Sequence, residues 1–183
     1  MIRALLAGLA LLAACRPSDT AGSGAARGGP RLIDFDERGG AFACRAPADW
    51  RALEDRGAGG PLVMFFAPRD DSGAVTISVT LYPDGVDRIK TPKDYWQALK
   101  LTQRHPSPLE TRQINGRTVY ATRFDAPRRA GESPRVLGID REDAVLIPGR
   151  AGFFTVCLRA SERDYQRALP VFEAIVQSFR PKS

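Results

Sequence analysis

Three carboxylates near residue 35 form the densest acidic cluster of the chain. In an extended strand, the side chains of Asp34 and Asp36 would point to one face, and Glu37 follows directly. Carboxylates placed in this way can serve as general acid and general base, or as oxygen ligands for Ca²⁺. The run Asp-Glu-Arg-Gly-Gly that begins at Asp36 is also typical of a hairpin turn. Of the two interpretations, the turn is favoured.

A second acidic cluster comprises Asp140, Glu142 and Asp143. Arg141 lies within it, and the cluster interrupts a segment that is otherwise typical of a strand. We therefore expect an exposed bulge or a sheet edge there, without a catalytic or metal-binding role.

The other residues that support common chemistries are few. His105 is the only histidine, and its position between Arg104 and Pro106 predicts an exposed helix end. After Cys15 the chain has one histidine and two separated cysteines, which are too few for a zinc site built from His and Cys. No Gly-x-Ser-x-Gly elbow supplies a nucleophile for a triad. The glycine-rich run 57–60 lacks the lysine of a phosphate-binding loop. We predict no catalytic residue, no metal site and no cofactor.

The first fifteen residues carry a different chemistry. A basic start at Arg3 and an apolar run over 4–14 precede Leu-Ala-Ala-Cys, which ends at Cys15. The run is shorter than the roughly 20 residues that a membrane-spanning helix needs, but it suits the core of a signal peptide. The four final residues resemble the lipobox of bacterial lipoproteins, in which the cysteine is acylated, with palmitate among its chains, and becomes the first residue after cleavage. The alternative is an ordinary secretory signal.

Cleavage before Cys15 would divide the chain into three parts. Residues 1–14 are the predicted signal peptide, 15–30 a lipidated flexible tether rich in Gly, Ala, Ser and Pro, and 31–181 a single folded domain. In the sorting pattern of Gram-negative lipoproteins, Arg16 in place of aspartate directs the protein to the outer membrane. Membrane attachment would then depend on the lipid.

The charge distribution argues against a nucleic-acid partner. The net charge is +6, but Arg and Lys are interspersed with Asp and Glu, as in Asp140-Arg141-Glu142-Asp143. No run of five like charges occurs in the sequence. The pattern indicates a solvated surface of mixed sign.

Cys44 and Cys157 form an even pair in a chain predicted to be exported, which makes them candidates for a disulfide. Each lies in a predicted strand. The alternative is two buried free thiols that pack as small apolar side chains.

Period-two alternation and turn residues predict a strand-rich domain. We expect a helical turn over 47–50 with Trp50 packed inward, a polar loop over 126–134, and an Asn115-Gly116 hairpin turn. Strands are expected at 32–35, 41–46, 63–67, 74–82, 109–114, 117–125, 135–147 and 152–160.

Two helices are predicted from their N-terminal signals. Thr91-Pro92-Lys93-Asp94 combines an N-cap, a proline at the first helical position and a capping box. Ser161 and Asp164 repeat the cap, and an apolar stripe follows it. Pro170 is expected to kink or divide the second helix, and Pro181 to stop it.

These elements, in this order, resemble the PsbP/Mog1-like domain. The resemblance rests on 42–50 (FACRAPADW), the strand 74–82, the helix entry 91–96 (TPKDYW), the Asn115-Gly116 hairpin and the closing 172–180 (FEAIVQSFR). It implies an α+β fold, in which a central, mostly antiparallel β-sheet is flanked by helices on both faces as an α/β/α sandwich. The family includes photosystem assembly factors, a nuclear-transport accessory protein and effector chaperones. They share binding, and no common active site transfers to this chain.

Together these observations predict a non-catalytic binding or assembly module, anchored by lipid in the cell envelope and facing the periplasm. Its partner would be an envelope protein or an apolar peptide, bound on the sheet or beside the helix at 92–104. One alternative is an envelope hydrolase or metal-dependent enzyme that uses Asp34, Asp36 and Glu37. Another is a carrier of a small apolar ligand.

Overall fold

The computed structural model describes residues 30–57, 60–68, 75–85, 88–103, 105–129 and 135–182. The predicted signal peptide, nearly all of the tether and the turn expected at 70–73 lie outside these residues. The elements are β1 (Leu32–Asp36), β2 (Phe42–Pro47), β3 (Arg51–Gly57), β4 (Gly60–Phe66), β5 (Thr76–Pro83), α1 (Pro92–Thr102), β6 (Glu110–Ile114), β7 (Arg117–Arg129), β8 (Val136–Gly149), β9 (Gly152–Ser161), α2 (Glu162–Ser178) and β10 (Arg180–Pro181).

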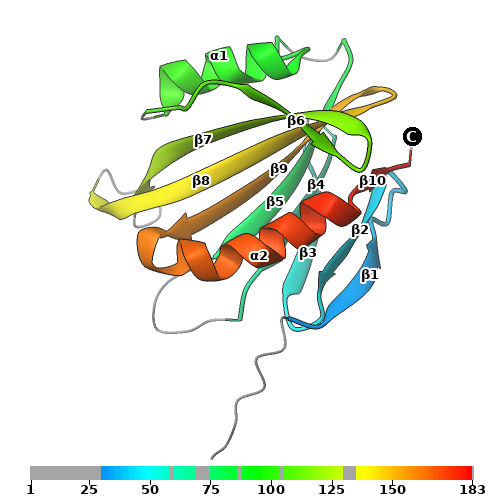
Figure 1. Cartoon of the computed structure of the whole chain (residues 1–183), viewed down its shortest axis with the longest axis horizontal. Helices are drawn as coiled ribbons and strands as arrows, with labels where there is room; N and C mark the ends of the chain where they lie inside the picture. The colour runs from blue at the N-terminus through cyan, green and yellow to red at the C-terminus, as the bar shows by residue number, and fades with distance from the viewer. Residues whose placement is uncertain are drawn as a thin grey trace, which may run out of the picture.

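The strands of the described residues form two antiparallel sheets. The large sheet has seven strands in the order β3-β4-β5-β9-β8-β7-β6, and the small sheet has three in the order β1-β2-β10. Every pairing within them is antiparallel. The fold is therefore mostly antiparallel β-sheet with two helices, and it is richer in β-structure than the predicted helix-flanked sandwich. The predicted fold has one central sheet, whereas β1, β2 and β10 form a second, separate sheet, which lies beside α2 in Figure 1.

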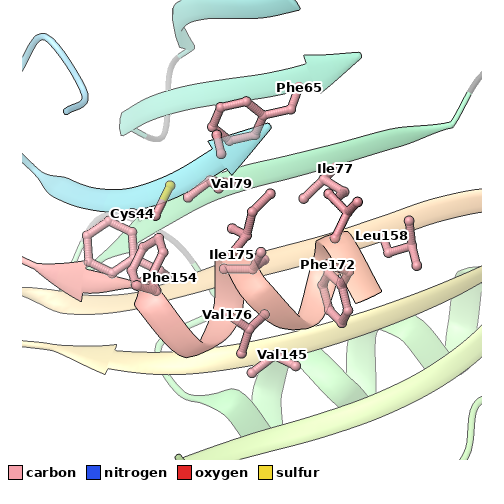
Figure 2. Close-up of a cluster of buried hydrophobic side chains, with 14 of the residues drawn as sticks. Cys44, Phe65, Ile77, Val79, Val145, Phe154, Leu158, Phe172, Ile175 and Val176 are labelled. Carbon is pink, nitrogen blue, oxygen red and sulfur yellow. The ribbon is translucent and has the colours of Figure 1, made fainter. Parts of the chain in front are cut away.

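Helix α2 packs against one face of the large sheet and forms the main core there. Its residues Phe172, Ile175 and Val176 are buried against Val145 of β8 and other strand residues (Figure 2). Phe42 of the small sheet stacks on Phe179 at a ring-centroid distance of 4.9 Å. The small sheet thus closes the core at the C-terminal end of α2. We call this side of the large sheet the α2 face.

Helix α1 covers part of the opposite face, the α1 face, as Figure 1 shows. Leu99 packs there with Phe124, Leu146 and Phe153, and Tyr95 joins the cluster from the same helix. The strands supply alternate side chains to the two clusters, because successive residues of a strand point to opposite faces. In β9, for example, Phe153 belongs to the α1 face and Phe154 to the α2 face.

Several local predictions are confirmed. Thr91 caps α1 in a capping box with Asp94, and Ser161 caps α2 by accepting the backbone N–H of Asp164. Asn115 has φ 52° and Gly116 φ 74°, as a type I′ turn requires. Trp50 packs against the main core.

Other local predictions are wrong. A turn is present at 47–50, where the Trp50 N–H donates to the Pro47 carbonyl at 3.2 Å, but the chain then continues as β3, a strand that the charged sequence Arg51–Asp55 did not indicate. β7 extends to Arg129, into the segment predicted as a polar loop. Pro170 does not divide α2, which continues to Ser178.

The two cysteines are free thiols on opposite faces of the large sheet. Cys44 is buried in the main core, whereas Cys157 packs with the α1-face cluster. Both thiols are free, so the disulfide considered for Cys44 and Cys157 is not formed in this structure. Burial raises the pKa of Cys44 to about 12 and that of Cys157 well above its ordinary value.

Candidate functional site

The first acidic cluster forms a turn. The carboxylate of Glu37 is buried and accepts the backbone N–H groups of Gly39, at 2.6 Å, and Ala41, at 2.9 Å. Asp36 instead receives Lys182 Nζ at 2.6 Å, and Asp34 is exposed. Glu37 and Asp36 therefore have separate partners, and the three carboxylates do not converge on a site. In the described part of the chain, no group of three or more His, Cys, Asp or Glu side chains is arranged to hold a metal ion.

The second acidic cluster lies inside the large sheet, and the prediction of an exposed bulge or edge there is wrong. Residues 140–143 belong to β8, between β7 and β9. Asp140 and Glu142 are buried on the α1 face, where Arg159 Nε lies 3.0 Å from Asp140 Oδ2 and 3.4 Å from Glu142 Oε1. Burial raises the pKa of Glu142, and the Arg159 charge partly opposes that shift. Ion pairing thus makes these carboxylates compatible with burial.

Asp143 points to the α2 face and joins two strands to helix α2. It accepts Arg123 Nε at 2.6 Å and a second guanidinium nitrogen at 3.2 Å, so the pair is bidentate. The hydroxyl of Tyr165 donates to the same carboxylate from the first turns of α2. Arg123 and Arg141 also lie over the Tyr165 ring, 5.6 Å and 5.2 Å from its centroid. One carboxylate therefore ties β7, β8 and α2 together.

A groove lies next to this contact, between α2 and the strands β6, β7 and β8. Its volume is about 530 Å³, and a smaller recess of about 120 Å³ shares Arg112, Arg123 and Asp143 with it. Its wall on α2 combines apolar and polar groups, which suits a ligand with both characters. The groove is lined by Arg112, Gln113, Ile114, Asn115, Arg123, Asp143, Val145, Leu169, Phe172, Glu173, Val176 and Gln177.

Two hydrogen bonds close the groove near the β6–β7 turn. The side-chain amide of Asn115 donates to the backbone carbonyl of Gln177, and an Arg117 guanidinium nitrogen donates to the carbonyl of Phe179 at 3.2 Å. Both acceptors lie at the C-terminal end of α2, where helix carbonyls need partners. The turn is thereby attached to α2.

The strand that borders the groove is an edge strand. β6 ends the strand order, and no described strand pairs with its outer side. Ile114 and Arg117 flank a two-residue turn and so form a hydrogen-bonded pair, and such pairs alternate with non-hydrogen-bonded pairs along the ladder. Thr111 and Gln113 fall in the non-hydrogen-bonded positions, so their backbone N–H and C=O groups point away from β7. These groups can accept a further strand.

A second recess lies on the other side of α2. It has a volume of about 380 Å³ and is lined mainly by apolar residues, among them Trp50, Val75, Ala168 and Val171. Pro30, the first described residue, also borders it. Few polar groups converge there to orient a ligand.

The groove was not predicted from the sequence. The register of β7 and β8 pairs Arg123 with Asp143. The predicted strands 117–125 and 135–147, joined by a loop over 126–134, would instead place Arg123 opposite Leu137, so they do not reveal the charge pair that borders the groove. His105 is exposed beyond the end of α1, as predicted, with φ 48°.

Three solved structures illustrate the similarity of this fold to known ones. Cyanobacterial PsbP from Synechocystis sp. PCC 6803 has a TM-score of 0.50 at 17% identity, over 88% of this chain and 98% of its own. The Ran-binding protein Mog1p of Saccharomyces cerevisiae has a TM-score of 0.52 at 14% identity, and the match covers 84% of this chain and 97% of Mog1p. LpqN of Mycobacterium tuberculosis has a TM-score of 0.51 at 15% identity, and the match covers 84% of this chain and 91% of LpqN.

A scan against protein-family models and a search of curated proteins find no match. Identities this low establish the fold alone. The chain therefore has a PsbP/Mog1-like fold, in agreement with the resemblance seen in its sequence.

The contact of Tyr165 with Asp143 predicts a pH dependence. Burial, together with the hydrogen bond to Asp143 and its charge, raises the pKa of Tyr165 from 10 to about 12. Because the folded pKa lies above the unfolded one, the associated stability is fully present below pH 10 and is lost as the pH rises through 12.

Ultraviolet difference titration of the wild type against Tyr165→Phe should therefore show Tyr165 ionising near pH 12. In Asp143→Asn, the pKa of Tyr165 should fall toward its ordinary value. An unchanged pKa in that variant would contradict the assigned contact.

Proposed function

We propose that this chain is a lipid-anchored binding or assembly module of the cell envelope, without catalysis, which binds an extended segment of an envelope protein along β6. The observation that carries the proposal is the position of the groove beside an open strand edge. A segment added to β6 would hydrogen-bond to the outward N–H and C=O groups of Thr111 and Gln113. Alternate side chains of that segment would point to the α2 face, where the groove lies.

The lining of the groove supports a peptide as its occupant. Leu169 and Phe172 on α2 offer apolar contact for a side chain of the segment. Arg112 and Glu173 offer charges of both signs at the rim. Arg112 is partly engaged, because its guanidinium lies 2.8 Å from Glu110 Oε2. This mixture of groups is typical of protein-binding surfaces, which have apolar centres and polar rims.

The predicted location also supports the proposal. The leader and the lipobox that ends at Cys15 predict a lipid anchor, and Arg16 predicts the outer membrane, with the domain facing the periplasm. LpqN, one of the proteins with a similar fold, is described as involved in cell envelope biogenesis. Among the described residues, no helix is long and apolar enough to cross a membrane.

Proline substitutions test binding along β6. In full-length protein with a photoreactive amino acid at Gln113, we expect a discrete cross-linked product in intact cells. Thr111→Pro removes an outward N–H without breaking a β6–β7 hydrogen bond, so it should abolish that product while preserving the fold. Gel mobility of the cross-linked chain measures the effect.

Ala52→Pro is the matched control. Ala52 is exposed on β3, the opposite edge of the large sheet, and pairs with Phe65 in the equivalent non-hydrogen-bonded position. It should leave the cross-linked product unchanged. If Thr111→Pro has no effect, or if Ala52→Pro removes the product equally, binding along β6 is refuted.

The lipid anchor has its own test. Cells that express the full chain should incorporate labelled palmitate into it, and the Cys15→Ser variant should not become labelled. The wild type should fractionate with the outer membrane. A wild-type chain that stays unlabelled and is recovered in the cytosol would disprove the anchor.

A further inference from the structure

The outer side of β6 is open to solvent. Its residues from Glu110 to Gln113 are exposed, and Ile114 is half-buried. The ladder with β7 is regular along its length, so β6 has neither the bulge nor the proline or lysine with which many proteins protect such an edge. At the opposite edge, β3 is contacted by the turn of the small sheet, where the Arg38 N–H donates to the Glu54 carboxylate at 3.0 Å.

The charges of β6 are complementary to those of a second β6. Glu110 and Arg112 are two residues apart and lie opposite Ala121 and Val119 of the main core, so both point to the α2 face. Their side chains are 57% and 55% exposed, and they pair with each other at 2.8 Å within one strand. A second β6, laid antiparallel, would offer each of them an opposite charge directly across the strand pair.

Charge selects one register for such a pair. The backbone groups of Thr111 and Gln113 point outward, so these residues must face each other or their own counterparts. With Thr111 opposite Thr111 of the second copy, Glu110 meets Arg112 twice. With Thr111 opposite Gln113, Arg112 would meet Arg112, which is unfavourable. With Gln113 opposite its counterpart, Arg112 would meet the apolar Ile114.

We infer that β6 pairs with β6 of a second copy of this chain, about a twofold axis at Thr111, and that this dimer covers the edge until a partner segment replaces it. The contact is isologous, since each copy offers the same strand. Two threonines facing each other form a favourable cross-strand pair. Because β6 has only five residues, the contact is short and exchanges readily for a partner.

This inference rests on the open edge that carries the proposed function and adds a form of regulation to it. The same N–H and C=O groups of Thr111 and Gln113 would bond either to the second copy or to the partner, so the two exclude each other. The proposed lipid anchor would confine the copies to one membrane surface and so raise their local concentration. Binding of the partner therefore requires dissociation of the dimer.

Disulfide trapping at the twofold axis tests the inference. In the full-length chain, purified in detergent, the cysteine of Thr111→Cys would face its counterpart at a Cα distance of about 5.5 Å, which suits a disulfide. Gln113→Cys is the matched control, because in this register the two residues 113 lie roughly 14 Å apart along the strands. The wild type reports any background from Cys15, Cys44 and Cys157.

In a glutathione redox buffer, Thr111→Cys should form a covalent dimer about tenfold faster than Gln113→Cys, as measured on non-reducing gels. Adding Glu110→Arg or Arg112→Glu to Thr111→Cys places like charges opposite each other, so trapping should slow about tenfold. An equal mixture of these two variants restores opposite charges and should restore trapping, as should both reversals in one chain. Circular dichroism would verify that each variant is folded.

Trapping at 111 that does not exceed trapping at 113, or that is unchanged by either charge reversal, would overturn the inference. The proposed function fails separately, because the photo-cross-link at Gln113 in cells identifies the bound chain by its mass. A product of two copies reports the dimer, and a product with a different chain reports the envelope partner. A partner product without trapping of the purified chain would refute the dimer alone, and the reverse result would refute the partner alone.

Discussion

The carboxylate of Asp143 holds together the part of the fold on which the candidate site depends. It receives a bidentate Arg123 from β7 and the Tyr165 hydroxyl from α2, while its own strand lies in the interior of the large sheet. Only 13% of the Asp143 side chain is exposed, whereas Arg123 is 54% exposed. The pair thus lies at the boundary between core and solvent. A largely buried carboxylate without partners would be costly, so its three hydrogen bonds determine where α2 begins over the sheet.

From that contact, the groove follows as a geometric consequence. α2 is fixed at its first turns by Tyr165 and at its last turn by the hydrogen bonds from Asn115 and Arg117. Between these two attachments, the helix runs alongside the outer strands without closing on them, and the groove lies there. Both ends of the groove are therefore set by polar contacts, while the core residues of α2 in Figure 2 hold the helix to the sheet.

Local chemistry allowed part of this fold to be predicted from the sequence. The Thr91 capping box, the Asn115-Gly116 turn and the alternation in β5 depend on residues close together in the chain, and each is present. The resemblance to PsbP/Mog1-like domains identified the fold because these elements also occur in a characteristic order.

The rest depended on tertiary pairing. β3 has a charged sequence that only an edge position makes acceptable in a sheet, and nothing local marks that position. Asp140 and Glu142 were expected at the surface because charges are rarely buried, yet Arg159 on the neighbouring strand compensates them. The groove combines β6, β7, β8 and α2, so no single segment could reveal it.

A double-mutant cycle between Asp143→Asn and Tyr165→Phe tests most directly whether this carboxylate positions α2. The free energy of unfolding would be measured by urea denaturation for the wild type, both single variants and the double variant. The account predicts a coupling energy of about 1 kcal/mol or more, whereas Asp143→Asn and Tyr120→Phe, which share no contact, should be additive to within about 0.5 kcal/mol. A coupling energy near zero for Asp143 and Tyr165 would contradict it.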